Sequence, residues 1–130
     1  MVTELPERVL YVDDEPTLVF LITRALEKLG IASQGFASAD EALAAFEREP
    51  QAFTLVLTDL TMPGSMSGLE LAQAVLAIRP ETAVVIASGC IDAAEERRAA
   101  AVGVRTVIQK PAKVAEMAQL VSKLLRDLRS

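Results

Sequence analysis

Short apolar runs alternate with segments of helical periodicity along the chain. Four runs rich in Val, Ile, Leu and Ala are typical of strands buried in a parallel sheet, and a fifth, residues 31–36, is a short and weaker strand pattern. The five runs cover residues 8–13, 31–36, 53–59, 82–87 and 104–109. After each run, apolar residues recur every three or four positions, which predicts helices that begin near Pro16, Ser38, Leu69, Ala93 and Val114.

This alternation predicts an α/β fold with a doubly wound, five-stranded parallel sheet and five helices on its two faces. The crossovers should be right-handed. In such sheets a ligand site lies beyond the carboxyl ends of the strands, where the strand order reverses. At 130 residues, the chain is expected to form a single domain over 1–130, with an ordered core at about 7–127.

Composition and charge narrow the classes of function. The net charge is −5 and no basic block occurs, which argues against nucleic-acid binding by this chain. No apolar stretch approaches the ~20 residues of a membrane span. Cys90 is the only cysteine, which fits a reducing compartment, and we expect a cytoplasmic protein. Histidine is absent, which excludes Ser-His-Asp catalysis and His-ligated zinc within the chain.

Charged residues follow three of the predicted strands at their carboxyl ends. Asp13 and Asp14 end the first, Asp59 ends the third, and Lys110 follows the fifth. Two carboxylates about 4 Å apart repel by about 4 kcal/mol at an effective dielectric constant of about 20. A hard divalent cation removes that cost, so we predict an Mg²⁺ or Mn²⁺ site with Asp14 and Asp59 as direct ligands and Asp13 acting through water.

Four short motifs, in order along the chain, resemble the receiver domain of two-component response regulators, the CheY-like family with a flavodoxin-like (βα)5 fold. The resemblance covers essentially the whole chain. The motifs are Val12-Asp13-Asp14-Glu15, Asp59 with Met62-Pro63 and Gly68, Ser88-Gly89, and Lys110-Pro111.

The resemblance implies that Asp59 is the phosphoacceptor, attacking the phosphohistidine of a sensor histidine kinase or histidine phosphotransfer protein. The backbone carbonyl of Thr61 would join Asp13, Asp14 and Asp59 in the metal site. Lys110 would neutralise the phosphoryl oxygens.

The resemblance also implies that the Ser88 hydroxyl bonds a phosphoryl oxygen after transfer and that a cis peptide precedes Pro111. Phosphorylation would then switch the surface around the fourth helix, fifth strand and fifth helix. Such a chain would be a monomer or weak dimer, with no enzymatic activity beyond its own phosphoryl transfer and hydrolysis.

Two features depart from the family. Val107 occupies the position, three residues before the lysine, where most receivers carry an aromatic side chain. The usual rotamer switch is therefore missing. The loop from Met62 to Gly68 is one residue longer than the usual Met-Pro-x-Met-x-Gly.

Alternative functions remain to be weighed. A receiver-like interaction module could signal without phosphorylation, and Val107 is the feature that favours it. A haloacid-dehalogenase-type phosphatase would need Asp-x-Asp after the first strand, which Asp13-Asp14-Glu15 does not supply. A flavin-binding protein would need a Ser/Thr/Gly loop in place of Glu15-Pro16. Incubation with a small phosphodonor and Mg²⁺ separates the phosphorylatable receiver from the interaction module.

Overall fold

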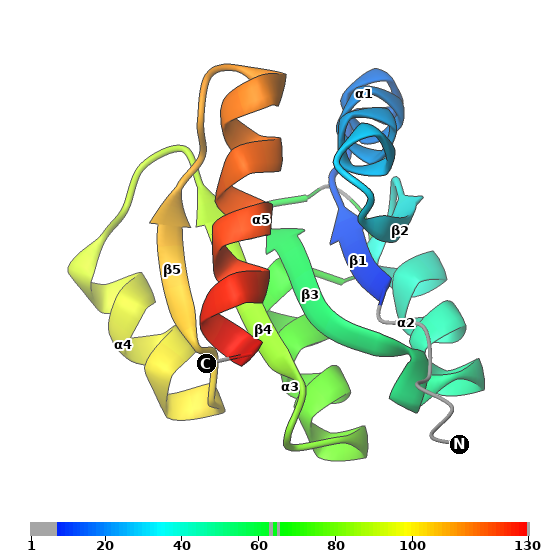
Figure 1. Ribbon diagram of the computed structural model, residues 1–130. Helices are drawn as coiled ribbons and strands as arrows, with labels where there is room; N and C mark the ends of the chain where they lie inside the picture. The colour runs from blue at the N-terminus through cyan, green and yellow to red at the C-terminus, as the bar shows by residue number, and fades with distance from the viewer. Residues whose placement is uncertain (1–7, 63, 65, 130) are drawn as a thin grey trace.

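The computed structural model describes residues 8–62, 64 and 66–129 and contains one parallel sheet with helices on both faces (Figure 1). The strands are β1 (Arg8–Val12), β2 (Ala32–Phe36), β3 (Phe53–Asp59), β4 (Ala83–Ser88) and β5 (Thr106–Gln109). The helices are α1 (Pro16–Lys28), α2 (Ala39–Arg48), α3 (Gly68–Ile78), α4 (Ala93–Val102) and α5 (Val114–Arg129), with a 3-10 turn at Pro50–Ala52. The predicted fold class is confirmed.

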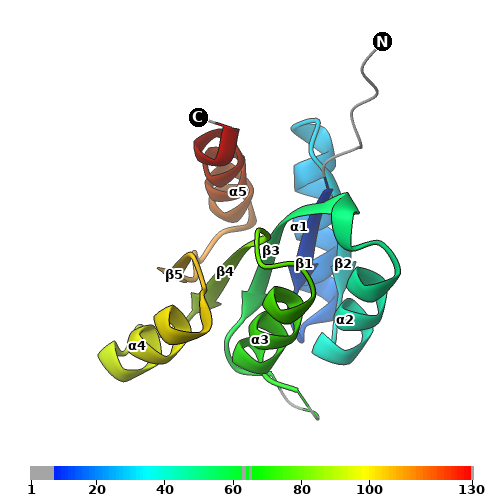
Figure 2. The same ribbon diagram turned by 90° about the horizontal axis from the view of Figure 1, so that it is seen from below.

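The strand order is β2-β1-β3-β4-β5, and every neighbouring pair is parallel. The order reverses between β1 and β3, which lie side by side although β2 separates them in sequence. This is the switch point at which doubly wound sheets bind ligands. Seen from below, α1 and α5 cover one face of the sheet, and α2, α3 and α4 cover the other (Figure 2).

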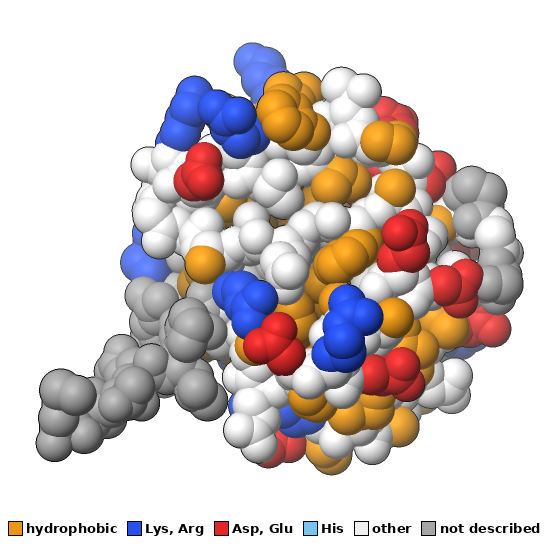
Figure 3. Space-filling view, turned by 90° about the vertical axis from the view of Figure 1, so that its right-hand side faces the viewer, with side chains coloured by type: hydrophobic (Ala, Val, Ile, Leu, Met, Phe, Trp, Pro, Cys, Tyr) orange, Lys and Arg blue, Asp and Glu red, His pale blue; other side chains and the backbone are white. Residues whose placement is uncertain are grey.

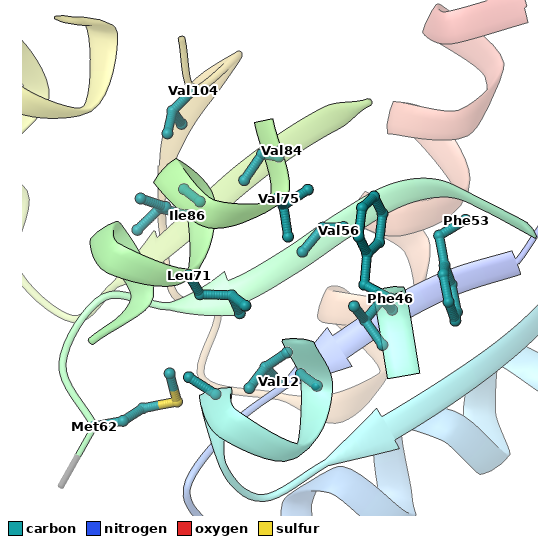
Figure 4. Packing of buried hydrophobic residues seen from close by; sticks show 14 of the residues in the cluster. Val12, Phe46, Phe53, Val56, Met62, Leu71, Val75, Val84, Ile86 and Val104 are labelled. Carbon is teal, nitrogen blue, oxygen red and sulfur yellow. The ribbon is translucent and has the colours of Figure 1, made fainter. Parts of the chain in front are cut away.

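Alternation along β1 supplies both faces with core residues. Leu10 and Val12 belong to the first apolar cluster, beneath α2, α3 and α4, whereas Val9 and Tyr11 belong to the second, beneath α1 and α5. Figure 4 shows the first cluster, in which the rings of Phe46 and Phe53 stack with centroids 6.0 Å apart. Both clusters are apolar layers that fix the sheet between the helices.

Helix ends account for most differences between predicted and observed boundaries. The fifth strand starts at Thr106 rather than 104, because Gly103 adopts φ 106° and the amides of Gly103 and Val104 bond the Ala99 carbonyl to close α4. The second strand starts at Ala32, because the Ile31 amide still bonds Leu26 at the end of α1. The 3-10 turn at Pro50–Ala52 has no periodicity that would predict it.

Side-chain caps start α2 and α4. The Ser38 hydroxyl accepts the Glu41 amide, and the Asp92 carboxylate accepts the amides of Ala94 and Glu95. On the face shown in Figure 3, acidic, basic and apolar side chains are interspersed. Within the described residues, no helix is both long and apolar enough to span a bilayer.

Candidate functional site

The carboxyl edge of the sheet brings the predicted acidic residues together. Val12 of β1 pairs with Thr58 of β3, so the next residues along the two strands, Asp13 and Asp59, lie beside each other. Asp14 follows at the start of the loop to α1. Each of these three aspartates offers a carboxylate oxygen within 4.8 Å of the others. Strand pairing and the start of the loop to α1 therefore concentrate three carboxylates at the switch point.

Lys110 joins this cluster at the same carboxyl edge of the sheet, from the edge strand β5. It directly follows β5, and its Nζ lies 2.8 Å from Asp13 Oδ2 and 3.0 Å from Asp59 Oδ2. Burial of the ammonium opposes its charge, but the two carboxylates outweigh burial and raise the pKa of Lys110. The lysine is therefore a fixed positive charge that bridges two strands.

Asp13 is fully buried, and its carboxylate accepts three hydrogen bonds. Burial alone would raise its pKa, but bonds from Lys110, the Glu15 amide and the Tyr11 hydroxyl lower the pKa below its ordinary value. The Glu15 amide lies 3.0 Å from Oδ1, and the Tyr11 hydroxyl lies 2.9 Å from Oδ2. Asp13 is thus held as an anion beneath the site surface.

Asp59 has the opposite electrostatic balance. Its side chain is 10% exposed. Burial raises the pKa of Asp59 to about 7, the Asp13 charge adds to the rise, and Lys110 opposes it. A perturbed carboxyl beside a charged partner in a concave site is typical of functional positions. Burial and the neighbouring Asp13 charge thus favour the protonated form of Asp59 more than in a solvent-exposed aspartate.

A pocket of about 260 Å³ opens over this edge. Its walls include the exposed Asp14 and Thr61 and the buried Asp59, together with Ser88 and Lys110. The Ser88 hydroxyl donates to the Cys90 carbonyl at 2.8 Å and accepts the Cys90 amide at 3.3 Å. Ser88 is therefore at the site, but its hydroxyl must release the Cys90 carbonyl before it can donate a hydrogen bond into the pocket.

The residues present fit a hard divalent cation. Three carboxylates converge without a His or Cys among them, and oxygen donors of this kind suit Mg²⁺ or Mn²⁺. Asp14 is exposed at the pocket, whereas Asp13 lies below it with three donors already bound. This difference favours Asp14 over Asp13 as a direct ligand.

The expected cis peptide before Pro111 is wrong. No cis peptide bond occurs among the described residues, and Lys110–Pro111 is trans. An X–Pro bond prefers trans by about 0.5–1 kcal/mol unless surrounding contacts reverse the preference. Lys110 Nζ reaches both carboxylates with the trans bond.

Gly68 sets how closely α3 approaches the acidic edge. A Cβ at this position would overlap the carbonyl oxygen of Asp59 and lie 2.9 Å from its carbonyl carbon. A capping box between Ser67 and Glu70 starts the helix there. Within the longer loop, Pro63 and Ser65 lie outside the described residues.

Tyr11 is the site residue that sequence reasoning missed. It looks like an ordinary strand residue in an apolar run, and its ring is 2% exposed. The available signal was its position two residues before Asp13, which puts both side chains on one face of β1. Val107, in contrast, packs half-buried against the first cluster.

Comparisons with known proteins agree with this geometry. The family model described as "Response regulator receiver domain" matches residues 9–122. The chain is 29% identical over 120 residues to "Response regulator receiver protein CpdR" of Brucella abortus (strain 2308), covering 92% of this chain and 97% of that protein. It is 33% identical over 103 residues to "C4-dicarboxylate transport transcriptional regulatory protein DctD" of Rhizobium meliloti (strain 1021), of which it spans 22%.

Solved structures show the same architecture. A CheY-like receiver domain protein from Methanospirillum hungatei JF-1 superposes with a TM-score of 0.81 at 26% identity, covering 93% of this chain and 94% of that one. A receiver protein from Pseudomonas putida gives a TM-score of 0.77 at 29% identity, covering 94% and 99%. The chain belongs to the response regulator receiver domain family of two-component signalling.

Proposed function

We propose that this receiver domain accepts a phosphoryl group on Asp59 from the phosphohistidine of a sensor histidine kinase or histidine phosphotransfer protein. The observation that carries the proposal is the Lys110 ammonium, which bridges Asp13 and Asp59 in a cluster of three carboxylates that faces an open pocket. A structural ion pair alone would not require a third carboxylate or a pocket above it. The proposed location is the cytoplasm, where the exposed Cys90 thiol would stay reduced.

In the proposed transfer, a carboxylate oxygen of Asp59 attacks phosphorus, and the bond between phosphorus and the partner's imidazole nitrogen breaks. The imidazole keeps the electron pair and takes up a proton, and Asp59 becomes a mixed carboxylic–phosphoric anhydride. Lys110 is already within hydrogen-bond distance of Asp59 Oδ2 and would follow the new negative charge. Hydrolysis of the same anhydride would be the chain's only other chemistry.

A divalent cation, Mg²⁺ or Mn²⁺, would supply charge neutralisation for the phosphoryl oxygens when bound. Asp14 and Asp59 are the proposed direct ligands, with the Thr61 carbonyl as a third, because all three residues line the pocket. Asp13 would act through water, since its carboxylate is buried below the pocket and already engaged. Its role would be to hold Lys110 and the ligand set in place.

The proposed output surface is formed by α4, β5 and α5. In α4 only Ala99 is fully buried, so a shift of this helix would disturb few packed side chains. The proposed trigger is Ser88, which would exchange Cys90 for a phosphoryl oxygen. Because position 107 carries Val instead of an aromatic residue, the structural change at Ser88 would reach the output surface through the packing of β5 itself.

A test of phosphorylation uses a small acyl phosphate with Mg²⁺ and intact-mass measurement of the whole chain. We expect a single phosphoryl adduct on the wild-type protein, loss of the adduct in Asp59→Asn, and a normal adduct in Asp127→Asn, which removes an exposed carboxylate of α5. An unmodified wild-type protein would instead favour the interaction module that signals without phosphorylation. An adduct that persists in Asp59→Asn would remove the nucleophile assignment.

A further inference from the structure

The hydroxyl of Tyr11 reaches the acidic cluster from inside the core. Its ring lies in the second apolar cluster, under α1 and α5, and is 2% exposed. The hydroxyl lies 2.9 Å from Asp13 Oδ2. A phenylalanine would fill the same core volume, so packing by itself does not call for an oxygen here. A buried hydroxyl costs free energy unless it is paired, and its partner is a carboxylate of the site.

Three donors fix the orientation of the Asp13 carboxylate. Oδ2 accepts from the Tyr11 hydroxyl and from Lys110 Nζ at 2.8 Å, and Oδ1 accepts from the Glu15 amide at 3.0 Å. Since a carboxylate oxygen has two lone-pair sites, both sites on Oδ2 are taken. The Tyr11 hydroxyl and the Lys110 ammonium therefore oppose any rotation of the carboxylate.

The same contacts continue to the proposed phosphoacceptor. Lys110 Nζ bonds Asp13 Oδ2 and Asp59 Oδ2 at once, so the chain of contacts runs from Tyr11 through Asp13 and Lys110 to Asp59. Removing the Tyr11 hydroxyl would leave the Asp13 carboxylate with two of its three donors, the Glu15 amide and Lys110 Nζ, and would free one acceptor site on Oδ2. The orientation of this carboxylate would then be less tightly fixed.

We propose that Tyr11 is a positioning residue of the metal and phosphoryl site, which it serves by fixing the Asp13 carboxylate in the orientation from which it would reach the cation through water and hold Lys110. This inference rests on the proposed function. It makes Tyr11 an outer-shell partner, in contact with neither cation nor phosphoryl group. Loss of such a partner typically weakens metal affinity by about 10- to 100-fold.

The first test compares Mg²⁺ affinity by calorimetric titration of the whole wild-type chain, Tyr11→Phe and a matched control, Thr82→Val. Thr82 precedes β4 at the opposite edge of the sheet, is buried, and its hydroxyl has no hydrogen-bond partner. Both variants therefore remove a buried hydroxyl and keep the side-chain shape. We expect the Mg²⁺ dissociation constant of Tyr11→Phe to rise about tenfold, with Thr82→Val unchanged.

The second test is spectroscopic and needs no variant. The chain has a single tyrosine and no tryptophan, so its near-ultraviolet tyrosine band reports on the Tyr11 hydroxyl and its partner. We expect MgCl₂ to shift the band of the wild-type protein, because charge neutralisation at the site changes the Asp13 acceptor. An equal concentration of KCl should give no shift, and a role confined to packing would not respond to either salt.

The outcomes separate the two proposals. If the wild type binds Mg²⁺ but the affinity of Tyr11→Phe changes by less than about twofold, Tyr11 serves packing alone and this inference fails while the proposed function stands. An unmoved tyrosine band in Mg²⁺-saturated wild type overturns it equally, even if Tyr11→Phe does not fold. A wild type that neither binds Mg²⁺ nor accepts a phosphoryl group removes both proposals.

Discussion

Replacing Lys110 by methionine should lower stability and strengthen metal binding at the same time. The variant keeps the apolar stem and removes the ammonium that lies 2.8 Å from Asp13 and 3.0 Å from Asp59. Asp13 is inaccessible to water and the Asp59 side chain is only 10% exposed, so water would compensate poorly for the lost charge. Removing one partner of a buried ion pair costs about 3–5 kcal/mol. Because the Lys110 side chain is 24% exposed, we expect a smaller loss of about 2–3 kcal/mol.

Metal binding should change in the opposite direction because Lys110 occupies carboxylates that the cation would share. Without this competing charge, we expect the Mg²⁺ dissociation constant to fall about tenfold, which corresponds to about 1.4 kcal/mol. Ligand binding to the folded state stabilises it by RT ln(1 + [L]/Kd). The stability gained on adding Mg²⁺ should therefore be larger in Lys110→Met than in the wild type.

The assay is urea unfolding followed by circular dichroism, in EDTA and across a series of MgCl₂ concentrations. Lys113→Met is the matched control, since Lys113 is exposed and lies three residues further along the chain. Its stability and its Mg²⁺ dependence should match those of the wild type. If Lys110→Met loses less than about 1 kcal/mol in EDTA, or gains no more from Mg²⁺ than the wild type, Lys110 does not neutralise these carboxylates.

Two further predictions concern the backbone and the charge of Asp59. Gly68→Ala should displace the Asp59 carbonyl and lower the free energy of unfolding by about 1–3 kcal/mol. The control Gly89→Ala adds a methyl group into open space and should leave the free energy of unfolding unchanged. Chemical unfolding measures both variants. The second prediction concerns the pH dependence of stability. Burial raises the pKa of Asp59 to about 7, whereas an aspartate in the unfolded chain has a pKa of about 3.9. The folded protein therefore holds a proton that the unfolded chain releases between these values, so stability in EDTA should fall as pH rises through that window, by at most about 1.4 kcal/mol per pH unit. Urea unfolding should find this slope flattened in Asp59→Asn; an equal slope in both would assign the titration to another group.

Sequence periodicity predicted the order of elements because the central strands β1, β3 and β4 are buried on both faces and the helices bury one face each. The charged residues at strand ends were informative for the same reason: an apolar run that stops at Asp59 or precedes Lys110 places these side chains at a known edge. Boundaries were less predictable, since they depend on which amide closes a helix. Val104 shows this, because it is apolar yet bonds back to Ala99 instead of joining β5.

The contacts within the site could not be predicted in the same way. Tyr11 is one more bulky residue in a buried strand until its hydroxyl is seen beside Asp13. The unequal environments of Asp13 and Asp59 likewise depend on three-dimensional donors that have no local sequence pattern. The trans bond before Pro111 differs from the isomer that the family resemblance implied, because the contacts around an X–Pro bond decide its isomer.

The sheet divides the interior into two separate cores, one on each face. The residues packed beneath α1 and α5 have no members in common with those beneath α2, α3 and α4. Volume lost in one core cannot be refilled from the other, and a substitution in one leaves the packing of the other in place. The two halves of the interior are therefore free to drift apart in composition over evolutionary time, provided that the strands between them keep their register.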